Sequence, residues 1–256
     1  MKNKTSSAVL MVLIAAAYLL AGTGIAAAEP TLPIPNINLD IGTAGDGEEL
    51  VTSLQLLLLL TVLSLVPAFL VLMTSFTRIV IVLGFVRNAL ATQNTPPNQI
   101  IVGLALFLTV FLMSPILAQI NEEAVQPLLE ESISQEEAMD IASEPLKEFM
   151  FAQTREKDLA LFVNIAGMEQ PGSRQEIPLT VLVPAFVISE LKTAFQMGFM
   201  LFLPFLIIDM VVASTLMSMG MFMLPPVMIS LPFKILLFIM VDGWHLVVKS
   251  LIESFG

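Results

Sequence analysis

The chain has 256 residues, of which 56% are hydrophobic and 13% are charged, and its mean hydropathy is +0.88. Soluble domains carry about 25% charged residues, so this composition excludes an ordinary soluble protein and a disordered one. The net charge of −11 gives no support to nucleic-acid binding, and the absence of cysteine with a single histidine, His245, excludes thiolate and multi-histidine metal sites. These exclusions leave an all-α protein associated with a membrane.

Residues 1–28 have the features of a secretory signal peptide. Two lysines precede an apolar stretch at 8–20, and small residues precede the expected cleavage site between Ala28 and Glu29. The alternative is an uncleaved first membrane helix, which the short apolar stretch disfavours. Cleavage would begin the mature chain outside the cytoplasm, with an acidic lead-in at 29–50 whose prolines and glycines predict an extended conformation.

Residues 51–119 are predicted to form the N-terminal apolar helices. An uncharged stretch at 51–77 is long enough to cross a bilayer, and Pro67 is expected to kink it. A second helix is predicted at 78–90, because two consecutive prolines soon follow it. A further uncharged stretch at 98–121 is also of membrane length.

Residues 120–178 form the solvated part of the chain, with thirteen acidic and four basic residues and a helix-forming pattern around 135–157. Simple hydropathy gives four spans in all, with Arg78 and Arg87 on the cytoplasmic side and the acidic segment outside the cytoplasm. Charges further along the chain argue against lipid-exposed spans. They favour membrane-associated helical hairpins packed in an oligomeric channel complex.

The C-terminal segment, residues 179–256, is predicted to form broken apolar helices, because ionisable residues and prolines interrupt its apolar pattern. Its ionisable residues at membrane depth are Glu190, Lys192, Asp209, Lys234 and Asp242. Glu190 and Lys192 are two positions apart, so they lie on different faces of a helix and each needs a partner elsewhere. These charges could pair between helices and subunits, or they could form a proton relay. Because an unpaired buried charge is costly, pairing is favoured.

Enzymatic activity is not indicated by the sequence. Asp209 and Asp242 are candidates for the carboxylate pair of an intramembrane aspartyl protease. Their neighbours do not match that class, and the chain has no phosphate-binding or dinucleotide-binding glycine pattern. We therefore predict a non-enzymatic protein without a cofactor or a metal ion.

The methionines are concentrated in one region. Eight of the 16 fall between Met197 and Met228, and the densest part alternates with other residues from Met217 to Met223. Gly220 and a following double proline predict a loop here. Thioether side chains are flexible, so a ring of them from several subunits would form a deformable hydrophobic constriction. The alternative is that these methionines only fill space in an apolar core.

Several sequence blocks occur in an order typical of one family. In chain order they lie at 74–83 with 87–99, at 103–109 with 113–115, at 184–198, and at 204–209 with 220–226, 232–234 and 242–244. Together they resemble the FliP family, the flagellar branch of the type III secretion export-gate proteins, over residues 54–256. The number and order of the blocks make this resemblance specific.

The resemblance implies an oligomer of several copies, a pentamer in this family, that forms a helical channel with small FliQ-like and FliR-like membrane proteins. Unfolded flagellar proteins would pass through this channel, in the bacterial inner membrane and the flagellar basal body. The pore gasket implied by the family comprises Met219, Met221, Phe222 and Met223, with Phe222 where methionine is common. Ala91 stands where the family usually has glycine, which is expected to matter little at a helix end.

Two alternatives remain open at this point. One is the corresponding subunit of a virulence injectisome, against which the signal peptide and the lead-in favour the flagellar member. The other belongs to a different class, an ion-coupled secondary transporter that uses the membrane-depth charges for its substrate or for protons.

Overall fold

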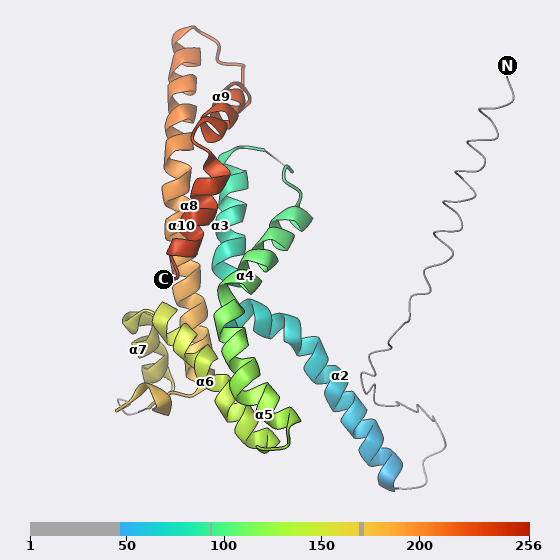
Figure 1. Ribbon diagram of the computed structural model, residues 1–256. Coiled ribbons are helices and arrows are strands. Elements are labelled where there is room, and N and C mark those ends of the chain that lie inside the picture. The colour runs from blue at the N-terminus through green and yellow to red at the C-terminus, as the bar shows by residue number, and fades with distance from the viewer. Residues whose placement is uncertain (1–46, 93, 169–171) are drawn as a thin grey trace, which may run out of the picture. The chain divides into compact units, whose positions relative to one another are not determined.

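The computed structural model describes residues 47–256 except 93 and 169–171, and all regular structure within these residues is helical (Figure 1). The predicted all-α class is therefore confirmed for this part of the chain. The predicted signal peptide, its cleavage site at Ala28 and Glu29, and the lead-in up to residue 46 lie outside the described residues.

The first two described helices match the predicted apolar stretches. α2 covers Gly47–Met73, so it begins four residues earlier than predicted, and it contains Pro67. α3 covers Phe76–Ala89. Apolar residues of α3 recur with helical spacing, and those from Ile79 to Val86 on its buried face are at most 1% exposed. This face places α3 in the middle of the apolar core.

Ala91 follows α3 in a conformation that the sequence did not predict. Its φ is +59°, in the left-handed region, and its amide donates to the carbonyl of Asn88 at 3.0 Å. A side chain makes this conformation less favourable by about 1–2 kcal/mol, whereas glycine adopts it freely. The expectation that alanine matters little here did not take this left-handed conformation into account, and the effect of alanine at this position stays a prediction.

The third apolar stretch is longer than predicted. α4 covers Asn98–Ile120 and continues through a π-helical stretch, η1, at Asn121–Val125 and a short helix, α5, at Gln126–Leu129. The first residues of the acidic segment thus continue the helix. Acidic residues, unlike proline, have a backbone N–H that can donate to the helix, so they do not by themselves end it.

Two further helices form about half of the acidic segment. α6 covers Gln135–Gln153 and α7 covers Glu156–Ile165, so the predicted helix around 135–157 is divided in two. The hydroxyl of Ser134 accepts from the amide of Glu137 at 3.2 Å and caps α6. A 3₁₀ turn, η2, at Arg174–Glu176 precedes the next helix.

α8 covers Leu179–Ser218 as one helix of 40 residues. This corrects the prediction that the apolar pattern is broken at 190–192 and again at Asp209. Charged side chains do not remove backbone hydrogen bonds, and both acids are neutralised by bases on other helices. The helix therefore continues through positions where a lipid-exposed span would have ended.

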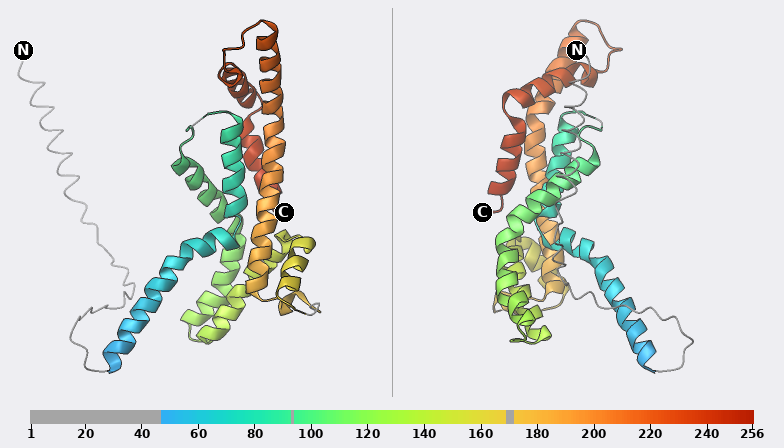
Figure 2. Two further views of the ribbon diagram at one scale, coloured as in Figure 1. Left: turned by 180° about the vertical axis from the view of Figure 1, so that it is seen from behind. Right: turned by 45° about the vertical axis from the view of Figure 1, so that its right-hand side comes forward.

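The breaks occur later in the chain. Residues 219–225 form a loop, α9 covers Pro226–Met240, and α10 covers Gly243–Glu253. α9 and α10 are bent by 64° relative to each other at Asp242, whose φ is +50°. Figure 2 shows α9 turning back from the end of α8, and α10 running beside α8.

By length and composition, three helical stretches within the described residues could cross a membrane. They are Leu56–Met73, Asn98–Leu129 and Leu179–Ser218. The bent pair of α9 and α10 would be a fourth if it counts as one span.

Two apolar clusters hold the helices together. The first is centred on α3 and receives one or more side chains from α4, α8, α9 and α10, including Ala105, Ala194, Phe238, Val247 and Leu251. The second packs α6 and α7 against the beginning of α8 and includes Met150, Phe151, Val163, Leu182 and Phe186. α8 contributes to both clusters, so it connects the acidic segment to the C-terminal helices.

Candidate functional site

Arg78 of α3 is the centre of a buried polar group that we call the Arg78 cluster (Arg78, Gln153, Glu190, Ser254 and Phe255). Its guanidinium forms an ion pair with Glu190 of α8, in which Nε donates to Oε2 at 2.9 Å and Nη2 donates to Oε1. Nη2 also donates to Oε1 of Gln153 at 2.9 Å, and Nη1 donates to the carbonyl and the hydroxyl of Ser254 at 2.7 and 3.0 Å. The side chains of the ion pair are only 2% and 0% exposed.

These contacts use all five N–H donors of the guanidinium. The ring of Phe255 covers its face, with the ring centroid 3.8 Å from Cζ of Arg78. A buried ion pair is tolerated when its remaining hydrogen-bonding groups are satisfied in this way. The cluster therefore fixes α3, α6, α8 and the residues after α10 to one another.

The junction of α6 and α7 docks on α8 beside this cluster. The buried hydroxyl of Ser189 donates to Oδ2 of Asp158 at 2.8 Å and accepts from the amide of Arg155 at 3.1 Å. The guanidinium of Arg155 donates to Thr193 at 3.2 Å and to Gln196 at 2.6 Å. One polar face of α8 thus anchors the acidic segment.

A second, partly buried ion pair joins α8 to α9. Nζ of Lys234 donates to Oδ2 of Asp209 at 2.6 Å, and the hydroxyl of Ser230 donates to Oδ1 at 2.5 Å. Ser230 and Lys234 are four residues apart, so they project from one face of α9. Lys234 is 2% exposed, and its charge is satisfied by the carboxylate. This pair fixes the α8–α9 hairpin near the loop that connects the two helices.

The loop at 219–225, which we call the methionine loop, begins with a well-formed helix end. Gly220, with φ +76°, donates to the carbonyl of Met217 at 3.0 Å, and the amide of Met221 donates to Leu216 at 2.9 Å. These two bonds define a Schellman motif, which needs a left-handed residue such as glycine. Met217, which belonged to the stretch predicted as a loop, is part of α8 instead.

The predicted gasket residues are all exposed at this loop. The exposed fractions are 68% for Met219, 42% for Met221, 76% for Phe222 and 96% for Met223. None of them fills the core of this chain, so core packing does not account for them. Large exposed apolar groups at one tip indicate a surface that another molecule or another copy covers.

The remaining predicted charges are placed differently. Lys192 and Asp242 are exposed, and neither side chain forms an ion pair or a hydrogen bond within the described residues. Of the five charges at membrane depth, the structure thus brings Asp209 and Lys234 together. It pairs Glu190 with Arg78, which was not among the predicted site residues. Arg78 is accordingly a buried, paired charge, and its predicted position on the cytoplasmic side stays a prediction.

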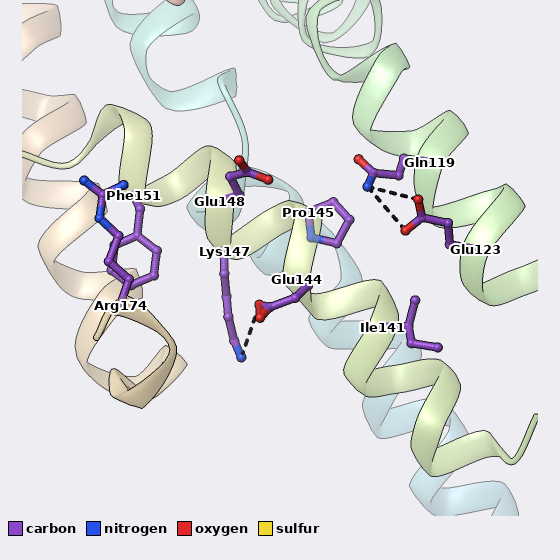
Figure 3. A pocket seen from close by; sticks show the side chains of 9 residues that line it. All are labelled: Gln119, Glu123, Ile141, Glu144, Pro145, Lys147, Glu148, Phe151 and Arg174. Carbon is purple, nitrogen blue, oxygen red and sulfur yellow. Dashed lines mark hydrogen bonds and ion pairs between the residues drawn. The ribbon is translucent and has the colours of Figure 1, made fainter. Parts of the chain in front are cut away.

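The acidic segment contains an open pocket of about 510 Å³ between α4–η1, α6 and η2 (Figure 3). Its lining includes three glutamates, but two of them have partners in the chain. Gln119 donates to Glu123 at 3.2 Å, and Lys147 lies 4.0 Å from Glu144. Within the described residues no group of three or more potential metal ligands comes together. The pocket has mixed charge and gives no support to a metal site.

Arg78, Gln153, Ser230 and Ser254 were missed by the sequence-based reasoning. For Arg78 a signal was present, because an arginine within an apolar helix requires a carboxylate nearby. For Ser230 the signal was its spacing of four from Lys234. Gln153 and Ser254 carried no comparable signal, since neither stands in an apolar stretch that makes its polarity unusual.

Membrane-length helices, joined by ion pairs and accompanied by an exposed apolar loop, define a helical membrane protein. The chain belongs to the FliP family, whose profile matches residues 59–251. It is 64% identical over 217 residues to the flagellar biosynthetic protein FliP of Bacillus subtilis (strain 168), covering 85% of this chain and 98% of that protein. The identity to the protein of the same name from Pectobacterium carotovorum subsp. carotovorum is 53% over 225 residues, covering 88% and 84%. For that of Borreliella burgdorferi it is 52% over 228 residues, covering 88% of each chain.

These relatives confirm the predicted family and its flagellar branch. They are flagellar biosynthetic proteins, and they give no support to an injectisome subunit or to a secondary transporter. The chain is accordingly a membrane-embedded protein of flagellar biosynthesis.

Proposed function

We propose that the chain is a core subunit of the flagellar type III protein export gate, and that its methionine loop is the hydrophobic gasket of the channel. The observation that carries the gasket assignment is the exposed apolar loop at the end of a hairpin that an ion pair joins. The loop presents Met219, Met221, Phe222 and Met223 to the exterior, and the Asp209–Lys234 ion pair holds the hairpin behind it.

In this proposal several copies, five by the family resemblance, place their methionine loops around one axis together with small FliQ-like and FliR-like partners. A ring of apolar side chains excludes hydrated ions, because an ion would lose its hydration without gaining ligands. Thioethers repack around an unfolded flagellar chain that is drawn through, and other components supply the energy. The chain then acts by passive gating and catalyses no reaction.

The exposed charges fit contacts between subunits. Lys192 lies on α8 among exposed apolar residues such as Ile188 and Phe195, and Asp242 lies at the bend between α9 and α10. A lone charge in apolar surroundings is stabilised by an opposite charge from a neighbour. Both residues therefore pair with charges of adjacent subunits in the proposed complex.

The proposal also assigns locations. After signal-peptide cleavage at Ala28, the chain would lie in the bacterial inner membrane within the flagellar basal body. The acidic segment, 120–178, would form the extracytoplasmic rim, because it is the strongly charged part of the chain.

Affinity purification of the full chain from its own membranes, followed by native mass measurement, tests this function. A gate subunit is expected to co-purify with other copies of itself and with two dissimilar small membrane proteins. Purification as a small homo-oligomer that takes up a specific solute in vesicles would instead identify a transporter.

A further inference from the structure

α9 and α10 form one bent unit whose polar ties to other helices lie at two places. Near its beginning, Ser230 and Lys234 bind Asp209. After its end, Ser254 and Phe255 bind Arg78 and Gln153. Within the part of the chain that the structure describes, no other side-chain hydrogen bond or ion pair joins 226–256 to another segment.

The bend between the two helices is tightly packed. A β-carbon on Gly243 would lie 2.3 Å from the Phe238 ring, so the backbone approaches this ring as closely as glycine allows. The Phe238 ring also meets Trp244 edge to face, with centroids 5.4 Å apart. Close-packed groups of this kind resist relative motion, so α9 and α10 are expected to move as one body.

The residues after α10 hold this end of the helix in place through polar contacts with Arg78 and Gln153. Ser254 offers its carbonyl and its hydroxyl to Arg78, while its hydroxyl donates to the carbonyl of Leu251 at 2.7 Å. The carbonyl of Phe255 accepts from Nε2 of Gln153 at 3.0 Å. The positive guanidinium thus lies at the carbonyl end of α10, where the helix dipole favours a cation. Withdrawal of these two residues would leave N–H donors of a buried charge unsatisfied, which is costly.

We propose that α9 and α10 are a lever that turns about the Asp209–Lys234 ion pair and is latched at its far end by Ser254 and Phe255. The methionine loop lies before Lys234, the pivot, at a distance of about 12 Å along α9. After Lys234 come the rest of α9 and then α10, which is about 16 Å long. A movement at the latched end therefore moves the loop. The inference rests on the proposed gate function, and it makes the closed position of the gasket depend on the Arg78 cluster.

Cysteine labelling of the full chain in its purified complex tests the latch. The sequence has no cysteine, so Val247→Cys provides a single reporter on the buried face of α10, at a position that is 3% exposed. Phe255→Ala, and deletion of residues 254–256, are expected to raise the rate of maleimide labelling at position 247 about tenfold or more. Glu253→Ala is the matched control, because it removes only an exposed pair with Lys249 and should leave the rate unchanged.

Ion conductance of the same complexes tests the lever. The latch variants are expected to raise the leak, as loop variants do, while Glu253→Ala does not. If Phe255→Ala prevents assembly, Phe255→Leu and Ser254→Ala carry the test, since each removes one contact and preserves most of the volume. Unchanged labelling in all latch variants overturns the latch. The lever is overturned if the latch variants are labelled faster but show no added leak, while the loop variants do leak. If neither loop nor latch variants leak, the gasket assignment fails and the lever with it, and the labelling rate still decides whether the latch exists.

Discussion

Gly198 of α8 and Phe85 of α3 are in such close contact that a β-carbon on Gly198 would lie 2.4 Å from the phenyl ring. The ring also meets Phe195 of α8 edge to face, with centroids 5.4 Å apart, and this contact restricts how the ring can move. Small residues at such crossings are how membrane helices approach one another closely. The glycine therefore sets the distance between the helices that carry Arg78 and Glu190.

Gly198→Ala is expected to destabilise the protein by about 1–3 kcal/mol, because an added methyl group forces the ring or the helix to shift. The measurement is denaturant or thermal unfolding of the purified protein. Gly84→Ala on α3 is the matched control, since a β-carbon there meets no atom within 4 Å. Alanine is the better helix former by about 1 kcal/mol, so this variant should be at least as stable as the original. Equal destabilisation by both changes would contradict the close crossing.

Ala91→Gly is expected to stabilise the protein by about 1 kcal/mol, because Ala91 has a φ of +59° that glycine adopts without strain. The gain is smaller than the full steric cost, since glycine also increases the entropy of the unfolded chain. Ala118→Gly, at an exposed position inside α4, should have the opposite sign and lose about 1 kcal/mol. A loss of stability at position 91 as large as that at 118 would show that the left-handed turn is not present in solution.

Hydropathy predicted the helices that depend on local sequence. α3 ends within one residue of its predicted end, although the left-handed turn at Ala91 ends it before Pro96 and Pro97 are reached. The methionine loop was predicted because Gly220 and two prolines favour a turn. The continuity of α8 was not predictable in the same way. It depends on Arg78 and Lys234, which neutralise two acids of α8 from positions 112 and 25 residues away in sequence. A local sequence pattern does not show which distant residue will pair with a given acid.

Met221→Ala together with Met223→Ala is expected to raise the ion leak of the assembled complex, because both side chains are exposed at the proposed constriction and alanine leaves it wider. Assembly should be unaffected, since neither residue belongs to the buried core. Conductance of the purified complex in a planar bilayer measures the effect. Met240→Ala removes a methionine that is 76% exposed outside the loop, and it should leave conductance unchanged. Equal conductance of the loop variant and the original would refute the gasket assignment.

Arg78→Lys is expected to lower the stability of the folded protein by about 1–3 kcal/mol, because lysine keeps the charge but leaves buried hydrogen-bonding partners unsatisfied. A single ammonium group cannot reproduce the planar set of donors that contacts Gln153, Glu190 and Ser254 together. The yield of monodisperse protein and its unfolding temperature measure the loss. Glu253→Gln breaks a pair that is about 60% exposed and should cost less than about 1 kcal/mol.

Glu190→Gln separates the two roles considered for the charges at membrane depth. If Glu190 only pairs with Arg78, the variant leaves a buried guanidinium without its counter-charge, so assembly and export should fall together. Replacing Arg78 and Glu190 together by apolar residues of similar volume should then restore part of the stability, because no charge is left buried alone. Normal assembly of Glu190→Gln with loss of proton-driven export would show that the carboxylate carries protons, and the relay would replace the structural pair as its function.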